Sequence, residues 1–115
     1  MFGKVKIGDT EVGMCCMASC DSYFKQIFGQ DPLKLASEDL DGATATDLFM
    51  KLGFVMAKFY ELKSRAKMRE LCEDDYIDWL AQFDRAEYAE ALEQIADIYS
   101  GNKTESSKAK KEDGQ

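Results

Sequence analysis

Residues 76–102, YIDWLAQFDRAEYAEALEQIADIYSGN, carry the clearest structural pattern in this chain. Apolar residues recur there at three-and-four spacing, first at Tyr76, Trp79, Leu80 and Phe83 and then at Tyr88, Ala91, Leu92, Ile95, Ile98 and Tyr99. This pattern predicts two amphipathic helices. Asp84 suits the N-cap of the second, with Glu87 as its capping-box partner, and Gly101 suits its end. We expect this αα-hairpin to organise the rest of the fold.

The first 16 residues predict a β-hairpin that precedes the helices. Apolar and charged residues alternate on both sides of residues 8–9, Gly-Asp, which suit a two-residue primed turn. Pairing across this turn would place Lys6 opposite Glu11 and Val5 opposite Val12, so that unlike charges and apolar side chains match. Because two strands alone are marginally stable in water, we expect helices to cover the apolar face of the hairpin.

A short helix and a loop are expected next. Ser19 is a suitable N-cap for a helix with an apolar stripe, and Gly29 followed by Asp31-Pro32 ends it. Between residues 33 and 43 the apolar pattern is weak, so the sequence predicts a loop with at most one turn of helix near Leu35.

The longest helix is expected to begin at Thr44 or Thr46 and to continue through Met68 towards Leu71. Its apolar residues cover so wide a face that we expect contacts on two sides. The resulting fold class is mainly α, with about four helices and an N-terminal β-hairpin, in one domain of residues 1–101. Residues 102–115 are almost entirely polar, which predicts a disordered tail because such a segment buries too little apolar surface.

Composition limits the classes of partner. The formal net charge is −7 and the pI is near 4.6, which disfavours nucleic acid because phosphate binding needs an excess of Lys and Arg. The sequence shows no basic-apolar leader and no run of eighteen apolar residues, so we expect a cytosolic protein that does not enter the membrane.

Charge is strongly segregated along the second half of the chain. Residues 58–69 contain five basic residues and only Glu61 as an acid, whereas residues 70–97 contain ten acidic residues against Arg85 alone. Such strips are usually solvated faces that pair loosely within the monomer, where each exposed pair contributes about 0–1 kcal/mol. They would also suit docking of another chain or self-association.

Motifs for chemistry are largely missing from the sequence. There is no histidine, which removes the commonest general base and every Ser-His or Cys-His pair. The cysteines, Cys15, Cys16, Cys20 and Cys72, do not form a Cys-x-x-Cys knuckle, and we interpret them as buried thiols that act as small hydrophobes. We therefore expect no enzymatic activity, no cofactor and no bound metal.

Several segments resemble the tail assembly chaperones of long-tailed bacteriophages and prophages of Gram-positive bacteria. The segments that carry the resemblance are KIGDTEV (6–12), YFKQIFGQD (23–31), FVMAK (54–58), YIDWLAQF (76–83), ALEQI (91–95), YSGN (99–102) and the tail KTESSKAKK (103–111). Their order and spacing follow the family over nearly the whole chain. Two departures are the cysteines at positions 15, 16 and 20 and Glu93, which stands where the family has the proline of Ala-Leu-Pro.

The resemblance implies a non-enzymatic role in virion morphogenesis. Chaperones of this family coat the aggregation-prone tape measure protein, bring tail tube subunits to it in the host cytoplasm and leave before the virion is complete. Family members are often also made in a longer form by a programmed ribosomal frameshift, for which the codons of Lys110 and Lys111 could supply a slippery run.

Three aromatic and four basic residues together form a predicted partner-binding strip. They are expected to bind through their exposed parts: Phe49, Phe54, Tyr60, Lys63, Arg65, Lys67 and Arg69. A helical client would suit such a strip. An alternative interpretation is a small acidic regulatory or anti-host binding protein of mobile-element origin that mimics nucleic acid. The gene neighbourhood separates the two, because a tail chaperone gene lies between genes for a tube subunit and a very long coiled-coil protein.

Overall fold

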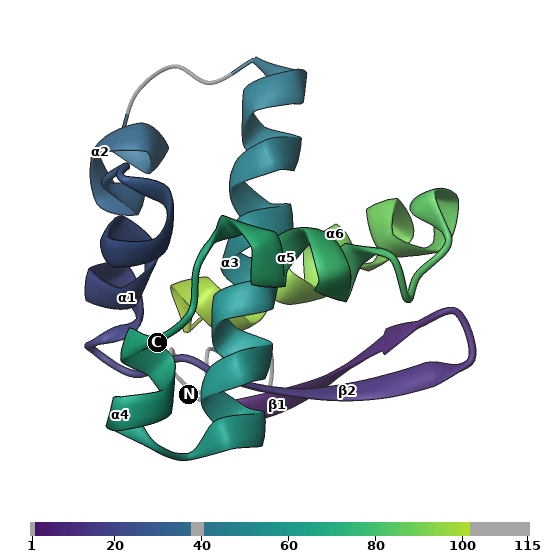
Figure 1. Ribbon diagram of the computed structural model, residues 1–115. Coiled ribbons are helices and arrows are strands. Elements are labelled where there is room, and N and C mark those ends of the chain that lie inside the picture. Colours follow the sequence, from purple (N-terminus) through teal and green to yellow (C-terminus); the bar gives the residue numbers. More distant parts are fainter. Residues whose placement is uncertain (1, 38–40, 102–115) are drawn as a thin grey trace, which may run out of the picture.

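The structure is a computed structural model that describes residues 2–37 and 41–101 and is mainly helical (Figure 1). In this part of the chain the elements are β1 (Phe2–Ile7), β2 (Thr10–Cys15), α1 (Cys20–Phe28), α2 (Pro32–Ser37), α3 (Gly42–Leu62), α4 (Arg65–Arg69), α5 (Glu73–Leu80) and α6 (Arg85–Ser100). The predicted fold class, mainly α with an N-terminal hairpin, is confirmed, although the described residues form six helices instead of about four. The predicted tail of residues 102–115 lies outside the described residues.

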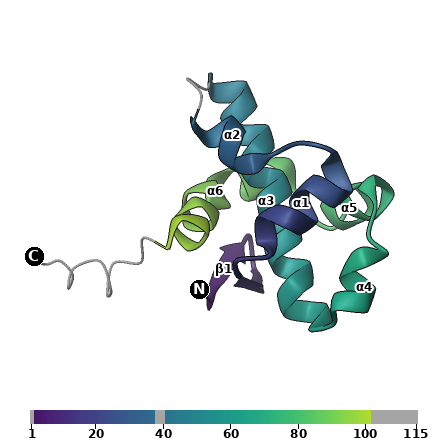
Figure 2. The same ribbon diagram turned by 90° about the vertical axis from the view of Figure 1, so that its left-hand side faces the viewer.

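Helix α3 is the centre of the fold, with α1, α5, α6 and the hairpin around it (Figures 1 and 2). Residues 52–57 are all buried, and six consecutive residues of an α-helix point in every direction around its axis. The expectation that residues 76–102 organise the fold is therefore wrong. The wide apolar face predicted for α3 correctly indicated contacts on more than one side.

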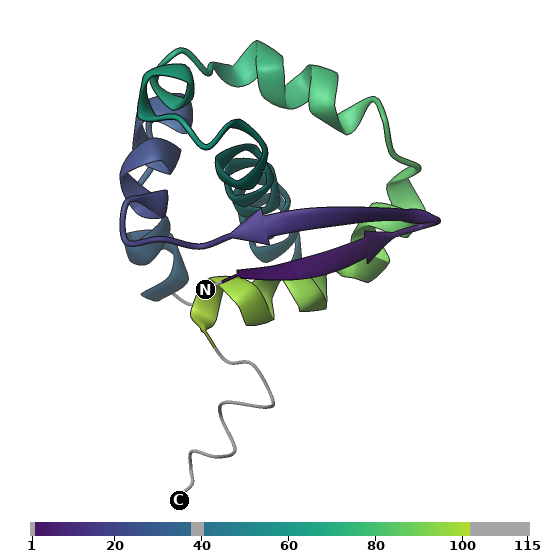
Figure 3. The ribbon, with the colours of Figure 1, turned by 90° about the horizontal axis from the view of Figure 1, so that it is seen from below.

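The hairpin has the predicted register, with Val5 opposite Val12 and Lys6 opposite Glu11. Gly8 in its turn has a φ of +62°, a conformation that glycine adopts without steric cost. Strand β2 crosses α3 and β1 lies along α6, as Figure 3 shows from below. The apolar face of the hairpin is covered by these helices, and Val5 is completely buried.

Helix α1 ends at Gly29, whose φ of +70° closes the last turn, as predicted. It begins after Ser19, but the Ser19 side chain does not make the capping hydrogen bond expected of an N-cap. The loop predicted for residues 33–43 is wrong in its first half, where α2 forms a short helix. Pro32 occupies the first helical position, where its missing N–H costs nothing, and the Asp31 carboxylate accepts a hydrogen bond from the Leu33 N–H at 3.0 Å. Residues 38–40 of that predicted loop lie outside the described residues.

Helix α3 begins earlier than predicted. Its N-cap is Asp41, whose carboxylate accepts a hydrogen bond from the Thr44 N–H at 2.7 Å, so that Thr44 and Thr46 lie inside the helix. The same bond lowers the pKa of Asp41, because it stabilises the ionised carboxylate. Asp41, rather than Thr44 or Thr46, therefore caps α3.

Helix α3 also ends earlier than predicted, at Leu62 rather than near Leu71. Lys63 has a φ of +51°, the left-handed conformation that stops a helix. Ser64 then caps the separate helix α4 by accepting a hydrogen bond from the Lys67 N–H at 3.3 Å. The turn directs Met68 into the core, where 1% of its surface is exposed, and this burial offsets the cost of a non-glycine residue in that conformation.

Helix α6 begins and ends at the predicted caps, but two other predictions for α5 and α6 are wrong. The Asp84 carboxylate accepts hydrogen bonds from the Ala86 and Glu87 N–H groups at 3.1 and 3.2 Å, and Gly101 ends α6 with a φ of +71°. The Glu87 carboxylate lies beside Gly8 of the hairpin turn instead of returning a bond to Asp84. The αα-hairpin is wrong as a packing unit, because both helices pack on α3 and meet at their junction, where Tyr88 contacts Trp79 and Phe83.

Candidate partner-binding site

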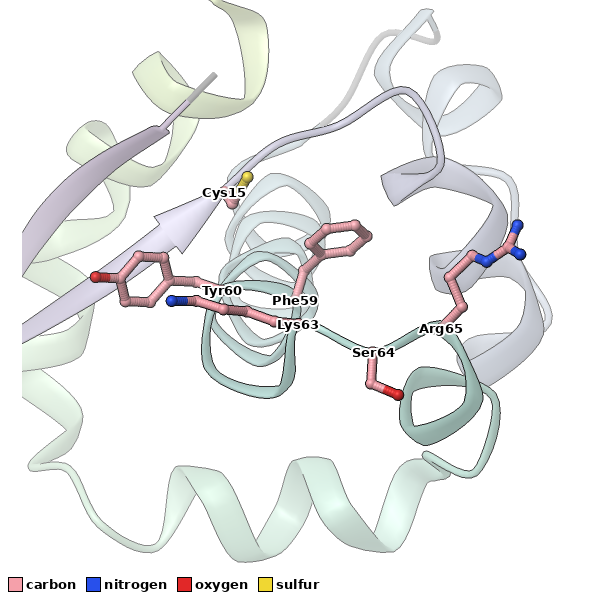
Figure 4. A pocket seen from close by; sticks show the side chains of 6 residues that line it. All are labelled: Cys15, Phe59, Tyr60, Lys63, Ser64 and Arg65. Atoms are coloured by element: carbon pink, nitrogen blue, oxygen red, sulfur yellow. The ribbon is translucent and has the colours of Figure 1, made fainter.

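A cavity of about 280 Å³ lies at the corner where α3 passes into α4. It is lined by Cys15, Phe59, Tyr60, Lys63, Ser64 and Arg65, which define the α3–α4 groove (Figure 4). The aromatic residues come from the last turns of α3 and Cys15 from the end of β2. Lys63 extends alongside Tyr60, whereas Arg65 lies on the other side, beyond Ser64. The groove thus has an aromatic floor with a cation on each side.

The position of Tyr60 is fixed by β2. A Cβ atom on Gly13 would overlap the Tyr60 ring, so glycine is what allows this ring to lie against the strand. The Lys63 ammonium lies 5.2 Å from the centroid of the same ring, within the range of a cation–π interaction. Phe59 contacts Tyr23 of α1, with ring centroids 5.9 Å apart. Both aromatic side chains of the floor are therefore held in place by neighbouring elements before any partner binds.

Helix α4 is held against α1, and this contact fixes the side of the groove that carries Arg65. The Gln26 side-chain amide donates hydrogen bonds to the Met68 and Arg69 carbonyl groups at 3.2 and 3.0 Å. Burial of Met68 adds an apolar anchor. A helix of five residues would not persist alone, so these contacts explain why the cations keep a defined place.

The four predicted cations of this region are exposed, and none takes part in an ion pair found among residues 2–37 and 41–101: Lys63, Arg65, Lys67 and Arg69. Lys58, in the same basic strip, differs because its ammonium lies 3.2 Å from the Glu61 carboxylate. The loose pairing expected within the monomer thus holds for Lys58, whereas the other cations remain available to an acidic partner.

The structure brings only part of the predicted set together. Tyr60, Lys63 and Arg65 line the groove, and Lys67 and Arg69 follow on α4. Phe49 lies eleven residues from Tyr60, about 16 Å along the helix, and packs half-buried against Tyr99. It is therefore not part of the groove.

The prediction for Phe54 is wrong, because none of its surface is exposed. Its ring centroid lies 5.4 Å from that of Tyr76 and 5.6 Å from that of Trp79, so the side chain belongs to the core. Sequence reasoning missed Phe59, Ser64 and Cys15. Ser64 could have been found from its N-cap preference, whereas the place of Cys15 depends on packing between β2 and α3.

A second cavity, of about 240 Å³, lies at the junction of α5 and α6 and is lined by Met50, Leu80, Phe83, Arg85 and Tyr88. The Tyr88 hydroxyl donates a hydrogen bond to the Met50 carbonyl at 2.7 Å, and burial raises the pKa of this tyrosine well above its usual range. The hydroxyl is thus a structural donor rather than an acid. Apart from Arg85, the lining offers no charge to a ligand.

All four cysteines are free thiols, and they differ in exposure. Cys20 is buried, as predicted, but Cys15 and Cys16 are half-buried and Cys72 is exposed, so the prediction of buried thiols is wrong for Cys72. A hydrogen bond from Cys20 lowers the pKa of Cys16 to about 7 and raises that of Cys20. Among residues 2–37 and 41–101, no three His, Cys, Asp or Glu side chains are placed to hold a metal ion.

No protein family, curated protein or solved structure matches this chain. In the part of the chain that the structure describes, none of the helices combines the length and the apolar character needed to cross a bilayer.

Proposed function

We propose that the chain is a non-enzymatic phage tail assembly chaperone that holds segments of the tape measure protein in the α3–α4 groove. The observation that carries the proposal is the groove itself, an aromatic floor with exposed cations on both sides. The resemblance described above supplies the biological role, and the groove supplies a place where a polypeptide can bind.

The shape and chemistry of the groove favour a polypeptide over a small molecule. Its volume of about 280 Å³ is just below the roughly 300–1,000 Å³ of small-molecule sites. Such a space suits one or two apolar side chains from a helix that continues along α4. The exposed cations would then select segments in which acidic residues flank the apolar ones.

A small groove suits a chaperone that must leave. One or two buried side chains and a few exposed ion pairs give weak, rapidly reversible binding to each segment. A long client with many such segments can nevertheless be covered by many copies. Release then requires no chemical step, because contacts of this strength dissociate unaided.

The proposal places the protein in the host cytoplasm and not in the mature virion. The resemblance also implies that tail tube subunits are brought to the tape measure protein. We assign no residues to that second interaction.

Two experiments test the proposal in sequence. The genes that flank the coding sequence are read first, and a tube subunit gene on one side with a very long coiled-coil protein on the other is expected. A neighbourhood of regulatory genes would instead favour the acidic regulatory or anti-host protein and would contradict the proposal.

The long coiled-coil protein is then expressed with and without the full chain, and its soluble fraction is measured. The chain is expected to raise that fraction. A variant in which all four cations of the groove and α4 are replaced, Lys63→Asn, Arg65→Gln, Lys67→Gln and Arg69→Gln, should fail to do so. Asn is chosen at position 63 because it tolerates the left-handed conformation there. Equal rescue by this variant would overturn the role of the groove.

A further inference from the structure

Helix α5 presents an apolar side chain beside two carboxylates to solvent. Its inner side carries the buried Tyr76 and Trp79, whereas Asp74, Ile77, Asp78 and Ala81 follow one another at helical spacing on the outer side and are all exposed. Ile77 has 61% of its surface exposed. We call Asp74, Ile77 and Asp78 the outer face of α5.

This outer face is complementary to the α3–α4 groove in both apolar character and charge. Asp74 lies three residues before Ile77 and Asp78 one residue after it, so the two carboxylates lie about one turn apart, roughly 6 Å along the helix, and both on the same side of the aliphatic side chain. The groove places Lys63 and Arg65 on either side of an apolar cavity large enough for such a side chain. Flexible Lys and Arg side chains can reach both carboxylates.

The two surfaces cannot meet within one chain. The inner side of α5 packs on α3 through Trp79 and Tyr76, so Ile77 points away from the body to which the groove belongs. Figure 3 shows α5 and the end of α3 on the same body, connected through α4. A contact between the outer face and the groove therefore needs two molecules.

We propose that the α3–α4 groove binds the outer face of α5 of a second copy of this chain, with Ile77 in the cavity and Asp74 and Asp78 against Lys63 and Arg65. This contact goes beyond the proposed function and holds whether or not that function is correct. It gives the segregation of basic residues before residue 70 and acidic residues after it a structural role.

The contact is heterologous, because each copy contributes a different surface. Every copy keeps one free groove and one free outer face after pairing, so association continues to rings or open chains rather than stopping at a symmetric dimer. The interface is small and each copy carries a net charge of −7, so the association is weak and depends on concentration. A client segment in the groove would displace the second copy.

Sedimentation velocity of the full chain, at concentrations up to roughly 1 mM, tests this contact. A thiol reductant is included because the exposed Cys72 would otherwise cross-link copies. The wild-type protein is expected to shift from monomer to a series of larger species as concentration rises. A wild-type protein that remains monomeric over the whole range overturns the proposal.

Two variants separate the two surfaces. The α5 variant, Ile77→Asp, and the groove variant, Lys63→Asn with Arg65→Gln, are each expected to weaken self-association about tenfold or more. Mixed in equal amounts they should form a discrete 1:1 pair, because the intact groove of the first meets the intact outer face of the second. Matched controls are Leu33→Asp, at an apolar residue on α2 with 60% of its surface exposed, and Lys6→Gln with Lys25→Gln, two exposed cations elsewhere.

The mixing result is decisive because it does not depend on the client. A mixture of two variants that stays monomeric while the wild-type protein associates shows that the copies meet through other surfaces and overturns the proposal. The same conclusion follows if the matched controls lose association as strongly as the two variants. Failure of the client experiment above with success here would leave the self-contact standing and reject only the chaperone role.

Discussion

Phe54 and Tyr60 lie on the same helix, six residues apart, and the molecule uses them in opposite ways. Phe54 is fully buried among the rings of Phe28, Tyr76 and Trp79. Tyr60 lies against β2 and remains partly exposed beside Lys63. The middle of α3 therefore stabilises the fold, whereas its last turns, where Tyr60 is partly exposed, offer aromatic surface to a partner.

The largest effect is expected at the buried member of this pair. Phe54→Ala should lower the free energy of unfolding by about 3–5 kcal/mol, because it removes a ring from the centre of the core and leaves a cavity. Urea denaturation followed by Trp79 fluorescence measures it. Tyr60→Ala is the companion variant and should cost clearly less; equal losses for the two would erase the distinction between core and groove.

The crossing of α3 and α6 gives the next largest effect. A Cβ atom at Gly53 would lie 2.7 Å from the Tyr88 hydroxyl oxygen and 2.9 Å from Ile95 Cδ1, so Gly53→Ala forces a buried contact apart. We expect a loss of about 1–3 kcal/mol in spite of the better helix propensity of alanine. Gly42→Ala in the first turn of α3 is the control, since a Cβ atom there meets nothing within 4 Å, and its melting temperature should stay equal or rise.

Buried tyrosines predict a loss of stability in alkali. Burial raises the pKa of Tyr76 to about 12 and those of Tyr88 and Tyr99 further, whereas the unfolded chain releases these protons near pH 10. The folded state thus keeps protons that the unfolded state loses, so their contribution is complete below about pH 10 and falls as the pH rises above it.

The urea midpoint should accordingly be nearly constant between about pH 7 and 9 and decrease between about pH 10 and 12. Tyr88→Phe should lower stability at neutral pH by about 1 kcal/mol, through loss of the bond to the Met50 carbonyl, and should reduce the alkaline decrease. An alkaline decrease of the same size in this variant would mean that Tyr88 does not contribute to it.

The smallest change in stability is expected at the groove. Lys63→Asn with Arg65→Gln should lower the free energy of unfolding by less than about 1 kcal/mol, through loss of the Lys63–Tyr60 cation–π contact, because both side chains are exposed and position 63 keeps a residue that tolerates its backbone conformation. Thermal unfolding by circular dichroism measures it. A drop of several kcal/mol would show that these cations support the fold.

Local signals in the sequence predicted the local structure well. The hairpin register followed from matching charges across the strands, and the ends of α1 and α6 followed from Gly29 and Gly101. What failed was the relation between distant elements. The stripe of α3 predicted its burial but not its place at the centre, because α5 and α6 show an equally regular pattern and periodicity does not say which helix the others surround.

The break after α3 shows a different limit. Residues 63–67, KSRAK, contain neither glycine nor proline, so the sequence carries no strong signal that ends the helix at Leu62. Lys63 adopts a conformation that lysine rarely takes, and contacts of Met68 with the core compensate it. The same limit explains why Phe54 and Tyr60 were grouped in the candidate site, since only the packing around α3 separates a buried ring from an exposed one.

The central claim is that the α3–α4 groove binds a polypeptide client. Its most direct test is the dissociation constant of the full chain for the tape measure protein encoded beside it, measured for the wild type, for Lys63→Asn with Arg65→Gln, and for the control Lys6→Gln with Lys25→Gln. The account predicts at least about tenfold weaker binding for the groove variant alone, at nearly unchanged thermal stability. Equal affinity for all three proteins would contradict it.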